Sequence, residues 1–247
     1  MGIYQKLIYP FVFSFFILAF SIHASTIEGK ISKNVDGDTV WVTDNAGEIF
    51  KIRMMEIDAP EWHMPSPNGI QAQGTWGEIA GRYMEKLIPK GTVVSVRNYG
   101  KDHYGRTLGT IFVKGEDINL KMAKSGWAIP YIYCGPNEYE NDYFQIHDTE
   151  AYLEACRNAR MAQKGVFDPG HLLTEMPFEF RMRVTGRKPE KWVGDYMTKK
   201  FYRPDQYKKV DVCARIFFSS SAEAKRAGFR AAPNAEIDEE MLMEAEF

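Results

Sequence analysis

Two short strings constrain this chain more than any other feature. The first is Val35–Thr39 (VDGDT), and the second is Arg53–Glu61 (RMMEIDAPE). Apolar runs with strand composition surround both strings, and Asp36-Gly37 is a strong turn signal. The chain is therefore expected to place acids and an arginine at the ends of hairpin-like strands. A third string, Asp102–Arg106 (DHYGR), adds a second arginine.

Short β-type runs and three helical patterns define the expected fold. The runs lie near residues 27–31, 40–42, 49–52, 92–96 and 107–113, a spacing that suits a small antiparallel barrel. Apolar residues at helical spacing predict a helix over about 79–88, which Pro89 ends. Two more helices are expected over 117–124 and from about 148 to Gly165. The predicted class is α+β, a five-stranded barrel with three helices and a small C-terminal α/β appendage.

The residue types in these strings suit phosphodiester chemistry. Asp38 and Asp58 could share one hard cation, completed by a backbone carbonyl and water, as calcium prefers. Glu61, held by the preceding proline, could orient or deprotonate an attacking water. Arg53 and Arg106 offer planar guanidinium forks that match the oxygens of a phosphate. Each of these residues alone is ordinary turn, loop or surface chemistry, so their combination carries the interpretation.

Over about residues 26–168 the sequence resembles the staphylococcal nuclease (thermonuclease) family. The motifs that carry the resemblance are Asp36–Thr39, Arg53, Asp58–Glu61, Asp102–Arg106, Tyr131–Tyr133, and Glu154-Ala155 ahead of Gly165–Phe167. The resemblance implies an OB-fold barrel with three helices. It also implies calcium-dependent hydrolysis of DNA and RNA that leaves 3′-phosphate products.

Carried over by position, the resemblance assigns roles to nine residues. Asp38, Asp58 and the carbonyl of Ala59 would bind calcium. Glu61 would act as the general base or position the water, Arg53 would stabilise the pentacoordinate phosphorus, and Arg106 would assist the leaving oxygen. The nucleotide would be lined by Tyr104 and by Tyr131 or Tyr133.

The N-terminus has the pattern of a secretory signal peptide. Lys6 precedes an almost uncharged apolar run over residues 7–22, and small residues follow near Ala24. Cleavage there predicts a periplasmic or secreted protein. An uncleaved membrane anchor over residues 7–22 is the alternative, and it is the only membrane association expected.

The C-terminal part differs in charge from the rest of the chain. Residues 178–230 carry 14 Lys and Arg against six Asp and Glu, whereas residues 231–247 carry six acids and no base. A basic segment of this length suits a polyanion, although a solvated charged face is an equal alternative. The predicted division is a signal peptide over 1–24, a nuclease-like domain over 25–170, a basic module over 178–232, and an acidic tail over 233–247.

The basic module also resembles the small zinc-binding module of bacterial DNA-alkylation repair proteins. The similarity runs through residues 201–209, 216–219 and 222–230, but Gln206 and Ala232 stand where that module has cysteines. Glutamine and alanine supply no thiolate, so a degenerate module without zinc is expected.

Three cysteines, Cys134, Cys156 and Cys213, show no metal-ligand spacing. In an oxidising compartment Cys134 and Cys156 could form a disulfide, and buried thiols are the alternative.

Three functions follow from these patterns. The favoured one is an exported calcium-dependent nuclease acting on DNA and RNA, with no stable protein partner. A catalytically silent binding or scaffold module with the same fold is the second, although such modules usually lose the acids and arginines retained here. An accessory nucleic-acid-binding protein, in which the basic module matters more than the barrel, is the third.

Overall fold

The computed structural model describes residues 25–135, 143–233 and 235. The predicted signal peptide lies outside the described residues, as does nearly all of the predicted acidic tail. Within the described part of the chain, no helix is both long enough and apolar enough to span a membrane.

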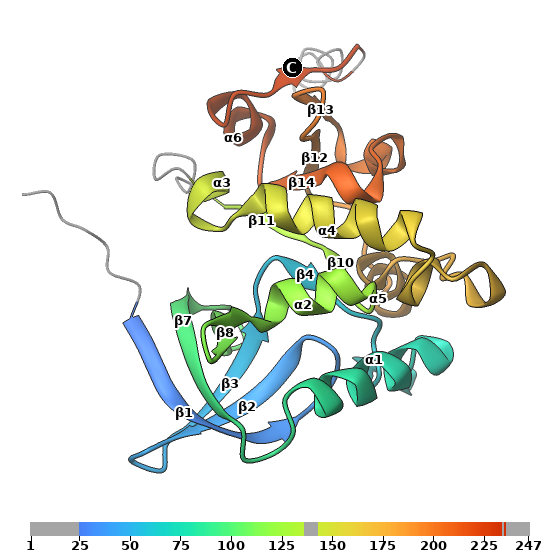
Figure 1. The fold of residues 1–247 in the computed structure, drawn as a ribbon. Coiled ribbons are helices and arrows are strands. Elements are labelled where there is room, and N and C mark those ends of the chain that lie inside the picture. Colours follow the sequence, from blue (N-terminus) through green and yellow to red (C-terminus); the bar gives the residue numbers. More distant parts are fainter. Residues whose placement is uncertain (1–24, 136–142, 234, 236–247) are drawn as a thin grey trace, which may run out of the picture.

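A closed five-stranded barrel forms one end of the molecule, drawn at the bottom of Figure 1. Its strands are β1 (Ser25–Asn34), β2 (Thr39–Asp44), β3 (Ile49–Met54), β7 (Val93–Lys101) and β8 (Thr107–Val113). They pair in the order β3-β2-β1-β7-β8, and a parallel pairing of β3 with β8 closes the barrel. Val40, Ile52 and Val96 are fully buried in its interior. The predicted five-stranded barrel is therefore confirmed.

Short strands extend the barrel toward the helices. β9 (Glu116–Asp117) pairs with β8, and β4 (Ile57–Asp58) pairs with β10 (Ile129–Pro130). A separate hairpin joins β5 (Met64–Ser66) to β6 (Gly69–Gln71).

The three predicted helices correspond to α1 (Gly74–Leu87), α2 (Ile118–Ser125) and α4 (Thr149–Met161), with a short α3 (Tyr143–Ile146) before α4. The Asp117 side chain caps α2 by accepting a hydrogen bond from the backbone N–H of Leu120, and Gly126 ends the helix in the left-handed conformation. α1 begins five residues earlier than the apolar pattern indicated. Its first turn contains Gly77, where a Cβ would lie 2.1 Å from the carbonyl oxygen of Glu61. Close packing against the Glu61 loop therefore requires glycine at this position.

Most of the C-terminal segment lies above α2 and α4, at the top of Figure 1, whereas its first helix, α5 (Pro177–Thr185), lies lower, at the level of α2. After α5 the segment contains β12 (Trp192–Asp195), β13 (Lys200–Tyr202), β14 (Arg215–Phe218), α6 (Ser221–Arg226) and β15 (Arg230–Ala231). Four 3₁₀ turns complete the described chain, η2 (Gly165–Phe167), η3 (Pro169–His171), η4 (Pro204–Lys209) and η5 (Val212–Ala214).

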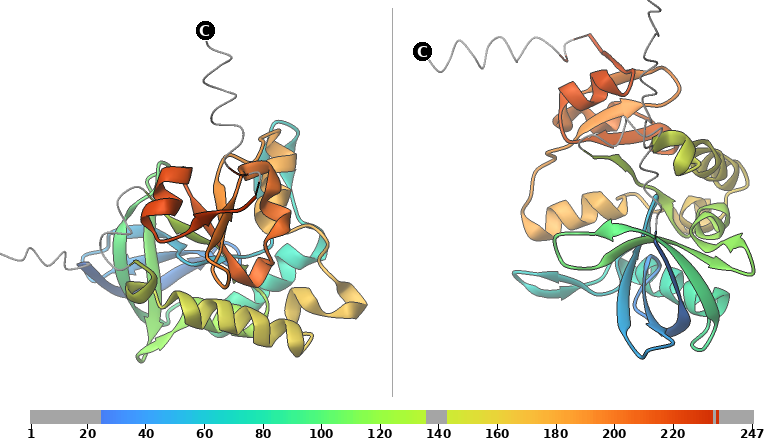
Figure 2. Two further views of the ribbon diagram at one scale, coloured as in Figure 1. Left: turned by 90° about the horizontal axis from the view of Figure 1, so that it is seen from above. Right: turned by 90° about the vertical axis from the view of Figure 1, so that its left-hand side faces the viewer.

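The C-terminal sheet takes one strand from the nuclease-like region. Its order is β11-β14-β12-β13-β15, and β11 (Ile132–Cys134) pairs in parallel with β14. The sequence analysis placed a domain boundary between residues 170 and 178. β11 lies before this boundary and β14 lies after it, yet both belong to one sheet. In the right-hand view of Figure 2, α5 lies between the barrel and this sheet.

Cys134 and Cys156, whose pairing the sequence left open, do not form a disulfide with each other. The disulfide joins Cys156, on α4, to Cys213, on η5, with their Cα atoms 5.4 Å apart. Cys134 lies buried in β11, within the C-terminal sheet. Cys156 packs instead among residues that contact η5, so the tertiary arrangement of α4 determines the pairing.

Candidate active site

Asp38 and Asp58 reach the same point from two different strand ends. Asp38 follows the Asp36-Gly37 turn at the start of β2, and one of its carboxylate oxygens accepts a 2.8 Å hydrogen bond from the backbone N–H of Ala59. Asp58 ends β4 and is fully buried. A Cβ on Gly37 would lie 2.5 Å from that of Ala59, so the two segments approach this closely only with glycine in the turn.

Arg53 connects the two aspartates. Its Nη1 lies 3.2 Å from Asp38 Oδ2, and its Nη2 lies 3.1 Å from Asp58 Oδ1. Nη1 also donates to the backbone carbonyls of Met54 and Ile57, which fixes the guanidinium at the end of β3. The two aspartates, the Ala59 segment and Arg53 are thus brought together.

Glu61 joins this group through a residue that the sequence did not reveal. Nη1 of Arg181, on α5, donates to Glu61 Oε1 at 2.7 Å and to Asp58 Oδ1 at 2.6 Å. Nη2 of the same side chain donates to Asp58 Oδ2 at 2.9 Å. Arg181 therefore binds both oxygens of a buried carboxylate and one oxygen of its neighbour. The excess of basic residues in the C-terminal segment was the only sequence signal for it, and that excess singles out no residue.

The clustered carboxylates perturb one another. Burial and the adjacent Asp38 raise the pKa of Asp36 to about 8. Burial also raises the pKa of Glu61, and Asp38 and Asp58 add to this rise while Arg181 opposes it. Burial alone would lower the pKa of Arg181, but Asp58 and Glu61 outweigh it and hold that pKa well above its usual value. Perturbed groups of this kind cluster at functional sites.

The remaining predicted residues line one cavity with this cluster. The cavity measures about 1010 Å³, and Asp38, Arg53 and Glu61 contribute to its lining. The other residues predicted from the sequence that line this cavity are Tyr104, Arg106, Tyr131 and Tyr133.

Arg106 lies on the β7–β8 hairpin and is held by a carboxylate of its own. Its Nε donates to Asp102 Oδ2 at 2.8 Å, and its backbone N–H donates to the other oxygen of Asp102. Its guanidinium lies 5.5 Å from the ring centroid of Tyr104, whose side chain is exposed. Arg106 therefore belongs to the cavity wall rather than to the ion-paired cluster around Asp58.

The donor set suits a hard cation. Asp38, Asp58 and the Ala59 carbonyl offer oxygen ligands only, and the two carboxylates converge on one guanidinium. Among the described residues, no group of three or more His, Cys, Asp or Glu side chains forms a metal-binding cluster. Two carboxylates and a carbonyl could hold such a cation and would leave its remaining positions to water.

Comparisons with known proteins agree with this geometry. A family model described as staphylococcal nuclease homologue matches residues 51–167. Endonuclease YhcR of Bacillus subtilis is 35% identical over 207 residues, which cover 82% of this chain but 16% of that protein. The matched region covers 82% of this chain, which is more than all the residues before α5 begins at Pro177. The match to YhcR therefore extends into the C-terminal segment.

Two shorter relatives match the nuclease-like part. The thermonuclease of Staphylococcus intermedius is 29% identical over 126 residues, covering 51% of this chain and 69% of that protein. An uncharacterized endonuclease of Escherichia coli O157:H7 is 33% identical over 154 residues, covering 62% of this chain and 84% of that protein. Together with the family model, this extent of similarity shows that the chain belongs to the staphylococcal nuclease family.

Proposed function

We propose that the protein is a nuclease that hydrolyses phosphodiester bonds of DNA and RNA with calcium and leaves 3′-phosphate ends. The observation that carries the proposal is the convergence of Asp38, Asp58 and Glu61 on Arg53 and Arg181, at the wall of a cavity that Arg106 also lines. The endonuclease and thermonuclease names of the relatives support the same activity.

Each residue has a role that its surroundings support. Asp38, Asp58 and the carbonyl of Ala59 would hold calcium, which would supply charge to polarise the phosphate. Glu61 would orient the water and accept its proton, since a carboxylate with a raised pKa is a better base near neutral pH. Arg53 and Arg106 would bind the non-bridging and leaving oxygens of the phosphate. Tyr104, Tyr131 and Tyr133 would contact the nucleotide from the cavity wall.

Export to the periplasm or medium is part of the proposal. The apolar run over residues 7–22 supports a signal peptide, and the Cys156–Cys213 disulfide supports an oxidising compartment. Fractionation of cells expressing the full chain, with mass measurement of the recovered protein, tests this directly. A protein of full-length mass in the membrane fraction would indicate the uncleaved anchor instead.

The activity is tested by release of acid-soluble nucleotides from denatured DNA and from RNA. The full chain would be assayed with calcium and with a chelator, beside Glu61→Gln and Arg106→Ala variants. We expect calcium-dependent release that both variants lose by at least 100-fold, the lower end for removal of a general base or an oxyanion donor. An Arg82→Ala variant, which removes an exposed guanidinium on α1, serves as the control. A folded protein that releases nothing with any divalent metal would favour the silent binding module.

A further inference from the structure

The active-site cavity has two walls, and the second comes from the C-terminal segment. The barrel and the acidic cluster form one side. α5 and the loop that follows it form the other, and this loop contributes Arg187, Lys188 and Lys191 to the lining. These three residues are called the basic wall below.

The basic wall is fixed in place by attachments on both sides of it along the chain. Before it, Arg181 on α5 binds Asp58 and Glu61. After it, β14 pairs with β11, and Cys213 is bonded to Cys156 of α4. A segment anchored in this way presents its side chains at a defined distance from the acidic cluster.

The charges of the basic wall lack carboxylate partners. Arg187 and Lys188 are exposed, and neither forms an ion pair with any acid in the described part of the chain. Several other bases of the segment are paired: Arg183 with Glu175, Arg203 with Asp205, and Arg226 with Glu223. Arg187 and Lys188 therefore present positive charge without a carboxylate partner to the cavity, where it favours a polyanion.

Lys191 connects the basic wall to the predicted nucleotide contacts. Its Nζ donates to the hydroxyl of Tyr131 at 2.9 Å and lies 4.2 Å from the ring centroid of Tyr133. The opposite wall has the same combination of groups. Lys33 and Lys51 lie 4.9 and 5.3 Å from the Trp41 ring centroid, and all three residues line the cavity.

Cations interleaved with aromatic rings are the combination that binds a single nucleic-acid strand. The cations follow the phosphates, and the rings stack against bases without reading their sequence. We propose that Arg187, Lys188 and Lys191 bind phosphates of the substrate strand outside the scissile bond, so that the C-terminal segment forms half of the substrate cleft. This inference rests on the proposed function, because it names a further contact of the same strand.

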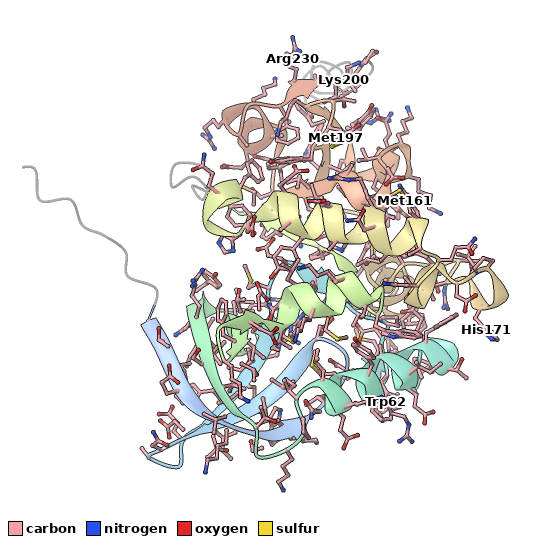
Figure 3. All side chains as sticks on the ribbon, in the orientation of Figure 1. Trp62, Met161, His171, Met197, Lys200 and Arg230 are labelled. Atoms are coloured by element: carbon pink, nitrogen blue, oxygen red, sulfur yellow. A yellow bond between two sulfur atoms is a disulfide. The ribbon has the colours of Figure 1, made fainter. Side chains whose placement is uncertain are left out.

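The salt dependence of binding tests the proposal separately from catalysis. A labelled single-stranded DNA of about 12 nucleotides, within the site sizes of OB-folds, would be titrated with the full chain carrying Glu61→Gln, with chelator present. Fluorescence anisotropy at several salt concentrations then gives the slope of log K against log salt. The test variant adds Arg187→Ser and Lys188→Ser. The control instead adds Lys200→Ser and Arg230→Ser. These two exposed residues are paired across β13 and β15, at one edge of the C-terminal sheet, and are labelled in Figure 3.

Each phosphate contact to a single strand contributes about 0.7 to the slope. The test variant removes two contacts, so we expect the magnitude of its slope to fall by about 1.4. If the two proteins bind equally at 1 M salt, this difference in slope weakens the binding of the variant roughly 25-fold at 0.1 M salt, one decade lower. The control should keep the parent slope. Equal slopes in the test and control variants would overturn the proposal, even if the parent protein hydrolyses DNA. A lowered slope in the test variant alone supports the basic wall, even if no hydrolysis is found.

Discussion

Replacing Arg181 with alanine should destabilise the protein far more than a typical surface substitution. The change removes both hydrogen bonds from Arg181 to Asp58, which is fully buried, and the bond to Glu61. Breaking a buried ion pair by removing one partner costs about 3–5 kcal/mol. Arg53 still binds Asp58 Oδ1 at 3.1 Å, so we expect a loss near the lower end, about 3 kcal/mol. For a chain of this size that corresponds to a fall in Tm of about 6–12 °C.

Urea and thermal unfolding with chelator present measure this loss. Arg183→Ala is the matched control, because Arg183 lies on the same helix but pairs at the surface with Glu175. It should leave the unfolding midpoint unchanged. Arg181→Lys should recover part of the loss, since an ammonium keeps the charge without the bidentate fork. An Arg181→Ala protein as stable as the Arg183→Ala control would refute the view that Arg181 satisfies a buried charge.

Calcium should partly reverse the effect of Arg181→Ala. A cation that binds Asp58 competes with the guanidinium for the same oxygens, so removing the guanidinium should strengthen calcium binding. Calorimetric titration should therefore give a lower Kd for the variant, and saturating calcium should raise its Tm more than it raises that of the parent. An unchanged Kd would show that the two cations do not compete.

Three further predictions follow from the described contacts. Cys213→Ser should cost about 4 kcal/mol in the chain-entropy model, because the disulfide to Cys156 spans 57 residues, and reductant should destabilise the parent but not the variant. Asp36→Asn should stabilise the metal-free protein in chelator most above pH 8 and change little below about pH 4, since the ordinary pKa of this carboxyl is 3.8. The raised pKa of Asp36 means that folding disfavours its charged form, so its contribution to stability falls as pH rises toward about 8. The acid limb of the kcat/KM profile should lie above pH 4.5, because burial raises the pKa of Glu61, which must be ionised to accept a proton; a limb at or below pH 4.5 would exclude Glu61 as that base.

The barrel could be predicted from sequence because its signals are local. Strand alternation and turn residues such as Asp36-Gly37 act over a few positions, and all five barrel strands formed where these signals lay. The end of α2 was predictable for the same reason, since Gly126 adopts a positive φ that few other residues tolerate. The start of α1 was missed because two glycines weaken the helical pattern in its first turn. One of them, Gly77, is required there by contact with the Glu61 carbonyl.

The parts of the site that escaped prediction depend on long-range contacts. Arg181 reaches Glu61 across 120 residues of sequence, and Cys213 reaches Cys156 across 57. No local pattern distinguishes Arg181 from Arg183 two positions later, although one binds a buried carboxylate and the other lies at the surface. Only the packing of α5 against the acidic cluster separates them.

The charge balance of the acidic cluster explains why Arg181, which the sequence did not reveal, matters to the site as a whole. Burial and Asp38 raise the pKa of Asp36 to about 8, so this carboxyl is largely neutral at pH 7. The other three acids of the cluster, Asp38, Asp58 and Glu61, have a formal negative charge of three. Arg53 and Arg181 offset two of the three charges, leaving an excess of one. Without the C-terminal segment the excess would be two, and Asp58 would keep one guanidinium instead of two. The family model ends at residue 167, before α5 begins at Pro177, so it does not include Arg181, whereas the match to endonuclease YhcR covers 82% of the chain and extends past this residue. The barrel side supplies the three acids and Arg53, and the C-terminal segment supplies Arg181, so the two parts together determine the formal charge of the cluster.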